Sequence, residues 1–179
     1  FEKELLAGEG EVTGRFDTRF TGPDMGPLNE YPFYDPQDAA TTATYVATFN
    51  NYVRTTLKFG AEADYVPSTH LYDTWDYRHL AVHQTFGDKD DRYFANVMPD
   101  LANAMIYNPK LKVMLNSGYF DLATPYFEGM YEMHHLPIPA SLLKNIEFKH
   151  YYSGHMVYVN PAEHKKLHDN VAKFIEETH

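Results

Sequence analysis

The spacing of hydrophobic and polar positions is irregular at the start of the chain. This stretch is rich in Gly, Pro, Thr and acidic residues, with one short helical pattern at residues 1–6 and loop chemistry at residues 21–27. A longer helix is predicted after Asp35, which can cap it, with Pro36 at the first helical position, where its missing N–H costs nothing. Its apolar positions recur at helical spacing until Gly60, a natural stop; they are Tyr45, Val46, Phe49, Tyr52, Val53 and Leu57.

Residues 61–98 show no clean period, and we expect irregular structure that covers another part of the molecule. They contain the single Trp75, several His and the acidic cluster Asp88–Asp91. The cluster lacks the spacing and the glycine of a calcium-binding loop, so it is interpreted as a solvated acidic turn.

Helices and strands alternate from residue 99 onward. Short apolar strands are predicted at residues 111–115, broken by Gly118, and at residues 146–152, ended by Gly154. Helices are predicted at residues 99–107, from Thr124 and Pro125 onward, and from Asn160 and Pro161 onward, where Glu163 completes a near capping box. This alternation predicts parallel strands joined by crossover helices, the α/β class. Two strands alone do not make a stable parallel sheet, so the rest of the sheet is expected from elsewhere.

Composition removes several classes of function. The 179 residues carry a formal net charge of −10, which disfavours binding to nucleic acids and to anionic membranes. No apolar run approaches the roughly 20 residues that span a bilayer. Cysteine is absent, which excludes disulfides, thiolate catalysis and zinc–thiolate sites but does not indicate a compartment. Tyr and Phe are abundant, and packing explains most of them.

Candidate chemistry follows the two predicted strands. The loop after the first strand ends in Asp121, and the loop after the second strand contains His155. An acid after one strand and a histidine after the next is the chain order of α/β-hydrolases, in which both follow the nucleophile. A neutral imidazole can take a proton from a serine hydroxyl, and a carboxylate on its other nitrogen holds the tautomer. Asp121 and His155 are therefore the candidate catalytic acid and base.

The nucleophile is missing from the chain. Its serines are Ser68, Ser117, Ser141 and Ser153, and none has the Gly-x-Ser-x-Gly surroundings of a nucleophile elbow. Ser117 and Ser153 lie in the acid and histidine loops themselves. We therefore expect the polypeptide by itself to be inactive.

The two loops resemble those of serine carboxypeptidases. Residues 111–125, LKVMLNSGYFDLATP, resemble the catalytic-acid segment of that family. Residues 152–161, YSGHMVYVNP, resemble its catalytic-histidine segment, with a Gly-His-Met core. Residues 12–22, VTGRFDTRFTG, are similar to a segment of the bacterial carboxypeptidase-like branch.

The resemblance implies the C-terminal part of an α/β-hydrolase fold, with residues 1–98 as cap or insertion region and residues 99–179 as core. It implies release of a C-terminal amino acid through an acyl-enzyme, with Met156 lining the pocket for the leaving residue. Tyr119 stands where the family often has the first Asp of Gly-Asp-x-Asp, and it is the second candidate substrate-binding residue. Many members have Pro where this chain has Tyr158.

The resemblance also implies a partner. The nucleophilic Ser and the oxyanion hole belong to an N-terminal polypeptide, and the substrate is a peptide. Because Phe1 lies within a helical pattern, we expect a C-terminal chain of a two-chain enzyme or a fragment. No cofactor is expected, an extracytoplasmic location is implied, and homo-oligomerisation stays open.

The rival functions are an esterase or acyltransferase with the same triad, and a catalytically silent binding protein of the same fold.

One histidine pair offers a metal-binding alternative. His164 and His168 have the spacing of two zinc ligands on a helix, but no Glu occupies the His-Glu-x-x-His position, and a solvated face of an amphipathic helix is preferred. His134 and His135 lie at a predicted helix end, which suits an imidazolium, and a structural role is preferred for them. No metal site is predicted.

Overall fold

The structure is a computed structural model that describes residues 1–69, 71–76 and 96–178. It divides into two compact units, Phe1–Trp75 and Asp76–His179. The acidic cluster Asp88–Asp91 lies outside the described residues. No helix in the described part of the chain is both long and apolar enough to cross a membrane.

The first unit opens with turns, and the helix predicted at residues 1–6 is wrong. A single 3-10 turn, η1 (Ala7–Glu9), ends at Gly10, whose φ of +71° is left-handed and favours glycine. Strands β1 (Glu11–Thr13) and β2 (Thr21–Pro23) then pair antiparallel. The loop predicted at residues 21–27 is thus wrong for its first three residues, since strands this short carry little periodic signal.

The long helix of the first unit is confirmed as α1 (Pro36–Thr55). Asp35 caps it as predicted, because its Oδ1 accepts hydrogen bonds from the N–H groups of Gln37 at 2.7 Å and Asp38 at 3.0 Å. The helix ends at Thr55 rather than at Gly60. Lys58 has a φ of +52°, so the chain has already left the helical conformation before Gly60. The short helix η2 (Leu71–Asp73) follows.

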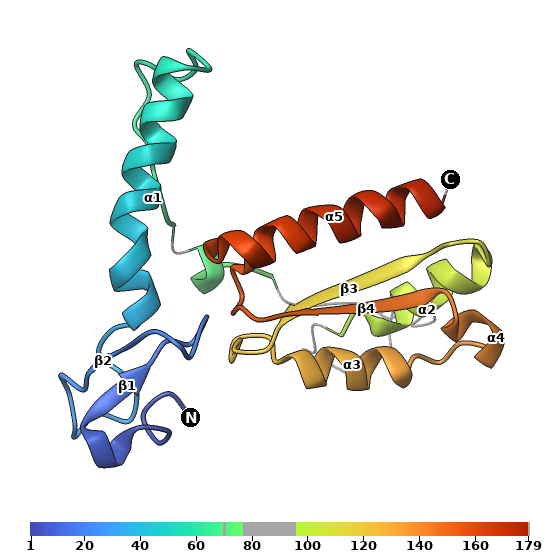
Figure 1. The fold of residues 1–179 in the computed structure, drawn as a ribbon, viewed down its shortest axis with the longest axis horizontal. Coiled ribbons are helices and arrows are strands. Elements are labelled where there is room, and N and C mark those ends of the chain that lie inside the picture. The colour runs from blue at the N-terminus through green and yellow to red at the C-terminus, as the bar shows by residue number, and fades with distance from the viewer. Residues whose placement is uncertain (70, 77–95, 179) are drawn as a thin grey trace. The chain divides into compact units, whose positions relative to one another are not determined.

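The second unit contains a parallel pair of strands, β3 (Val113–Gly118) and β4 (Ile146–Tyr151), in register from Val113 opposite Ile146 to Gly118 opposite Tyr151. Figure 1 shows α5 (Pro161–Glu177) on one face of the pair and α3 (Tyr126–His134) on the other. A parallel pair with helices on both faces confirms the α/β class.

The remaining helices are α2 (Met98–Tyr107), α4 (Ala140–Leu143) and η3 (Val157–Val159). The first of these was predicted and α4 was not, because four residues are too few for a helical period. The predicted cap at Thr124 is wrong: α3 begins at Tyr126 without a side-chain cap. Gly118 does not break β3 but forms its last residue.

A compact core holds the sheet on the α3 side. Its buried members come from α2, α4, β4 and the connection after α3; they are Ala102, Met105, Leu136, Leu142 and Ile146. Full burial of one such side chain contributes about 1.5–3 kcal/mol. On the opposite face Tyr151 donates its hydroxyl hydrogen to Asn116 Oδ1 at 2.9 Å and accepts from Asn170 of α5 at 3.2 Å. The pair of strands is therefore held on both faces, by the apolar core near its opening residues on one face and by the Tyr151 hydrogen bonds on the other.

Candidate active site at the ends of two parallel strands

The acid loop and the histidine loop stay paired after the strands end. Tyr119 N donates to Tyr151 O at 3.1 Å, and Phe120 N donates to Ser153 O at 3.1 Å. These bonds continue the ladder between β3 and β4 into both loops. Parallel strands end at the same edge of a sheet, so this continuation brings Asp121 and His155 to one place.

Gly118 is the residue that allows the loops to approach so closely. A Cβ at this position would lie 2.2 Å from the carbonyl oxygen of Gly154 and 2.4 Å from that of Ser153. Both contacts are with backbone, which cannot rotate away as a side chain can. The glycine three residues before the acid thus has a steric cause.

Asp121 is a buried carboxylate whose oxygens are both engaged. The residue is only 5% exposed. Its Oδ1 accepts from the N–H groups of Ala123 at 2.8 Å and Thr124 at 2.9 Å. Its Oδ2 accepts from the Thr124 hydroxyl at 2.7 Å and pairs with His155 Nδ1 at 2.8 Å. A carboxylate so buried needs such donors, because an unpaired charge in this setting costs several kcal/mol.

The bond to Asp121 sets the tautomer of His155. An ionised carboxylate only accepts hydrogen bonds, so the ring nitrogen that faces it, Nδ1, carries the hydrogen. The Thr124 hydroxyl, which has given its hydrogen to Asp121, also lies 3.2 Å from Nδ1 and presents a lone pair to it. In the neutral ring Nε2 is then the basic nitrogen. The His155 side chain is 43% exposed, so the ring extends from its buried partner toward the surface.

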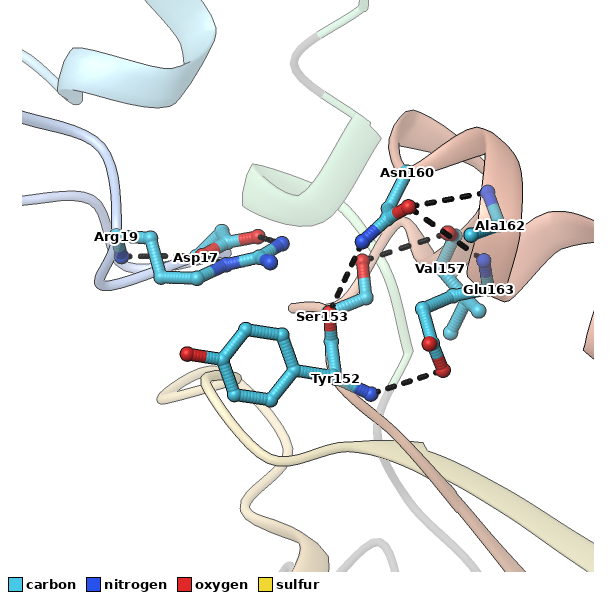
Figure 2. A network of polar contacts seen from close by, with 8 residues as sticks. All are labelled: Asp17, Arg19, Tyr152, Ser153, Val157, Asn160, Ala162 and Glu163. Atoms are coloured by element: carbon cyan, nitrogen blue, oxygen red, sulfur yellow. Dashed lines mark hydrogen bonds and ion pairs between the residues drawn. The ribbon is translucent and has the colours of Figure 1, made fainter.

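The histidine loop is held against the first turn of α5. The hydroxyl of the buried Ser153 donates to Val157 O at 3.3 Å, which closes the loop on itself. Asn160 caps α5 by accepting from Ala162 N at 3.1 Å and donates to Tyr152 O at 3.3 Å. Figure 2 shows these contacts together with the carboxylate of Glu163, which accepts from Tyr152 N at 3.0 Å.

A cavity of about 650 Å³ lies beside the pair. Its wall includes Asp121 and His155, four consecutive residues of β3 and one side of α3; the residues from these two elements are Leu115, Asn116, Ser117, Gly118, Glu128, Gly129 and Glu132. The buried Ser117 Oγ has no hydrogen-bond partner among the described residues. The cavity leaves room for a reacting group beside the imidazole, and its wall includes residues of β3 but none of β4.

The structure brings Asp121 and His155 together and places the other two predicted residues apart from the cavity wall. The Tyr119 ring packs edge-on against Tyr126, with ring centroids 5.1 Å apart, and close to His150. Met156 is half-buried at the start of η3. Neither Tyr119 nor Met156 is among the residues that line the cavity.

Two residues of this site were not recognised in the sequence. Thr124 is predicted to be a helix cap, but its N–H and hydroxyl both bond to Asp121, whose side chain also closes a turn with Ala123 N two residues on. Glu163 was assigned to a near capping box, and its carboxylate instead reaches back to the histidine loop. For both residues the position in the sequence was compatible with two different hydrogen-bond partners.

The two histidine pairs have different surroundings. His134 stacks on Phe148 with centroids 5.0 Å apart, and His135 stacks on Tyr131 at 4.0 Å. His164 and His168 lie on the exposed side of α5. Within residues 1–69, 71–76 and 96–178, no group of three or more His, Asp or Glu side chains is placed to hold a metal ion.

Comparison with known proteins found no match: no protein-family model matches the chain, and neither a curated protein nor a solved structure does.

Proposed function

We propose that this chain is the acid-and-base part of a serine-type carboxypeptidase of the α/β-hydrolase fold. The observation that carries the proposal is the 2.8 Å contact between Asp121 Oδ2 and His155 Nδ1 at the ends of adjacent parallel strands. The carboxylate is buried and fully bonded, whereas the imidazole is accessible. This is the arrangement that a general base and its orienting acid require.

In the proposed reaction a serine from an N-terminal partner polypeptide attacks the carbonyl of the C-terminal peptide bond. His155 Nε2 takes the serine proton, and Asp121 stabilises the resulting imidazolium without itself becoming protonated. The same Nε2 then gives the proton to the leaving amine, and an acyl-enzyme remains. Water, activated by the same imidazole, hydrolyses that ester. The partner also supplies the oxyanion hole, and no cofactor takes part.

The need for a partner is supported by the sheet. Among the described residues β3 pairs with β4 and with no further strand. A parallel pair of two strands is not stable alone, and the other edge of β3 has no strand beside it in the part of the chain that the structure describes. The cavity is lined by four residues of β3, among them Ser117, whose buried Oγ has no hydrogen-bond partner among the described residues. A sheet contributed by the N-terminal polypeptide would cover that edge and present its serine to His155.

The choice of carboxypeptidase over esterase rests on the resemblance of residues 111–125 and 152–161 to the acid and histidine segments of serine carboxypeptidases. An extracytoplasmic location follows from the same resemblance. An esterase or acyltransferase would use the same Asp121–His155 pair. A silent binding protein would retain the pair without turnover.

The test is an assay of the chain assembled with its partner polypeptide, against blocked dipeptides and small esters. Release of the C-terminal amino acid that is blocked by a serine-directed phosphonate, and lost in His155→Ala, supports the proposal. Hydrolysis of esters alone would favour the esterase. An assembly that turns over neither substrate would be the silent binding protein, and the proposal would be wrong.

A further inference from the structure

Glu163 is a buried carboxylate whose burial needs an explanation. It occupies the third position of α5, and the residue is only 5% exposed. Removing a charge from water costs several kcal/mol unless hydrogen bonds and an opposite charge compensate. Oε2 accepts from Tyr152 N at 3.0 Å, and Oε1 forms an ion pair with Lys166 one turn along the helix. The buried carboxylate is therefore stabilised by the Tyr152 N–H and by the Lys166 ammonium group.

The bond to Tyr152 is not the bond that the sequence position predicts. In a capping box the carboxylate at this position accepts from the N–H of the cap residue. Here the N–H of the cap residue, Asn160, donates to Val157 O at 3.3 Å. The carboxylate of Glu163 is directed away from the helix start and toward the histidine loop, so its role is not explained by capping.

The backbone N–H and C=O of Tyr152 both form hydrogen bonds with side chains at the start of α5. Glu163 takes its N–H, and the Asn160 side chain donates to its C=O at 3.3 Å (Figure 2). Tyr152 is the first residue after β4, three residues before His155. These bonds fix the direction in which the chain leaves the sheet, and that direction determines where the imidazole can lie.

We propose that Glu163 is a positioning residue for His155, which keeps Nδ1 of the imidazole against Asp121. The proposal deepens the proposed function and rests on it for its catalytic meaning. The structural part of the proposal concerns only the tautomer of His155. Without the hydrogen bond from Tyr152 N to Glu163 the histidine loop can move, and the 2.8 Å contact between His155 Nδ1 and Asp121 Oδ2 is lost. A neutral imidazole released into water favours the hydrogen on Nε2, which makes the wrong nitrogen basic.

The test compares Glu163→Ala and Glu163→Gln with the control Glu176→Ala, an exposed glutamate on the same helix. The ring 15N shifts of His155 report the tautomer without any enzyme assay. In the assembly with the partner polypeptide we expect the Nδ1–H tautomer in the unsubstituted protein, in Glu176→Ala and in Glu163→Gln, whose amide oxygen can still accept from Tyr152 N. In Glu163→Ala we expect a shift toward Nε2–H, with amide hydrogen exchange at Tyr152 faster by about 10-fold or more.

In the assembled enzyme, Glu163→Ala should lower kcat by about 10- to 100-fold with little change in KM, and Glu163→Gln should recover most of it. If Glu163→Ala does not fold, Glu163→Asp replaces it, because it keeps the charge but withdraws the carboxylate by one methylene. An unchanged tautomer and unchanged Tyr152 exchange in the variant that folds would overturn the positioning role. A tautomer shift combined with an assembly that never turns over substrate would support the positioning role and remove the proposed function.

Discussion

Gly118 lies directly against the backbone of Gly154, so close that a Cβ on Gly118 would be 2.2 Å from the Gly154 carbonyl oxygen. This contact lets the acid loop and the histidine loop leave the sheet side by side. The Asp121–His155 pair depends on it, because each side chain is only a few residues from the contact.

Gly118→Ala should therefore separate the two loops. Placing a methyl group against fixed backbone costs about 1–3 kcal/mol or more, and we expect a loss of that size in the free energy of unfolding together with loss of the Nδ1–H tautomer of His155. Chemical denaturation and ring 15N shifts measure the two effects. The matched control is Gly129→Ala in α3, where the new Cβ would meet the flexible end of Leu115 at 3.1 Å and alanine favours the helix. Equal effects of the two substitutions would contradict this assignment.

Asp121→Asn should reverse the tautomer of His155. Because Oδ1 accepts from two backbone N–H groups, the amide oxygen of the asparagine takes that place and its NH2 group faces His155. Nδ1 must then accept, and the hydrogen moves to Nε2. We expect a fall in kcat of about 10⁴-fold, the size seen for this exchange in a serine protease triad. An Nδ1–H tautomer in the variant would show that Asp121 does not orient the ring.

Thr124→Val should weaken the pair without abolishing it. The substitution keeps the branched shape and the backbone bond to Asp121 Oδ1 but removes the hydroxyl that donates to Oδ2. The loss of one hydrogen bond to a charged group predicts a decrease in kcat of about 10-fold, at similar KM. Thr124→Ser retains the hydroxyl and should retain most activity; steady-state kinetics on the assembled enzyme distinguish the two. Identical rates for Val and Ser would mean that the hydroxyl has no role.

The α/β class and the contact between Asp121 and His155 could be predicted because both rest on strong local signals. The alternation of helical patterns with short apolar runs predicted the two strands and the helices around them. Asp35 and Asn160 cap their helices as expected. The order of acid and histidine after successive strands then placed Asp121 beside His155. The prediction of parallel strands was confirmed by the parallel pairing of β3 with β4.

The features that the sequence analysis predicted wrongly, or did not predict, have a different cause. Thr124 could cap α3 or bond to Asp121 in its own loop, and Glu163 could bond to its cap residue or to the histidine loop. Only the three-dimensional positions decide between these partners. Gly118 was interpreted as a strand breaker because glycine lowers strand propensity, whereas here the close approach of another backbone requires it. The short strands β1 and β2 and the helix α4 are too brief for periodicity to reveal.

The core between α2 and the sheet should be sensitive to truncation. Met105 has no exposed surface, and its replacement in Met105→Ala should lower the free energy of unfolding by about 2–5 kcal/mol. Met25→Ala, at a methionine that is 67% exposed, is the control and should change it by less than about 0.5 kcal/mol. Thermal or denaturant unfolding of both variants is the measurement. A tolerated Met105→Ala would contradict the packing of α2 against this core.

The most direct test of the proposed catalytic pair is the rate at which a serine-directed phosphonate labels the assembly of this chain with its proposed partner, with the modified residue identified by mass spectrometry. We expect labelling on a serine of the partner polypeptide and not on Ser68, Ser117, Ser141 or Ser153, slowed by about 10³-fold or more in His155→Ala. Labelling that proceeds at the same rate in His155→Ala, or that fails in the unsubstituted assembly, would contradict a role for Asp121 and His155 in activating a serine.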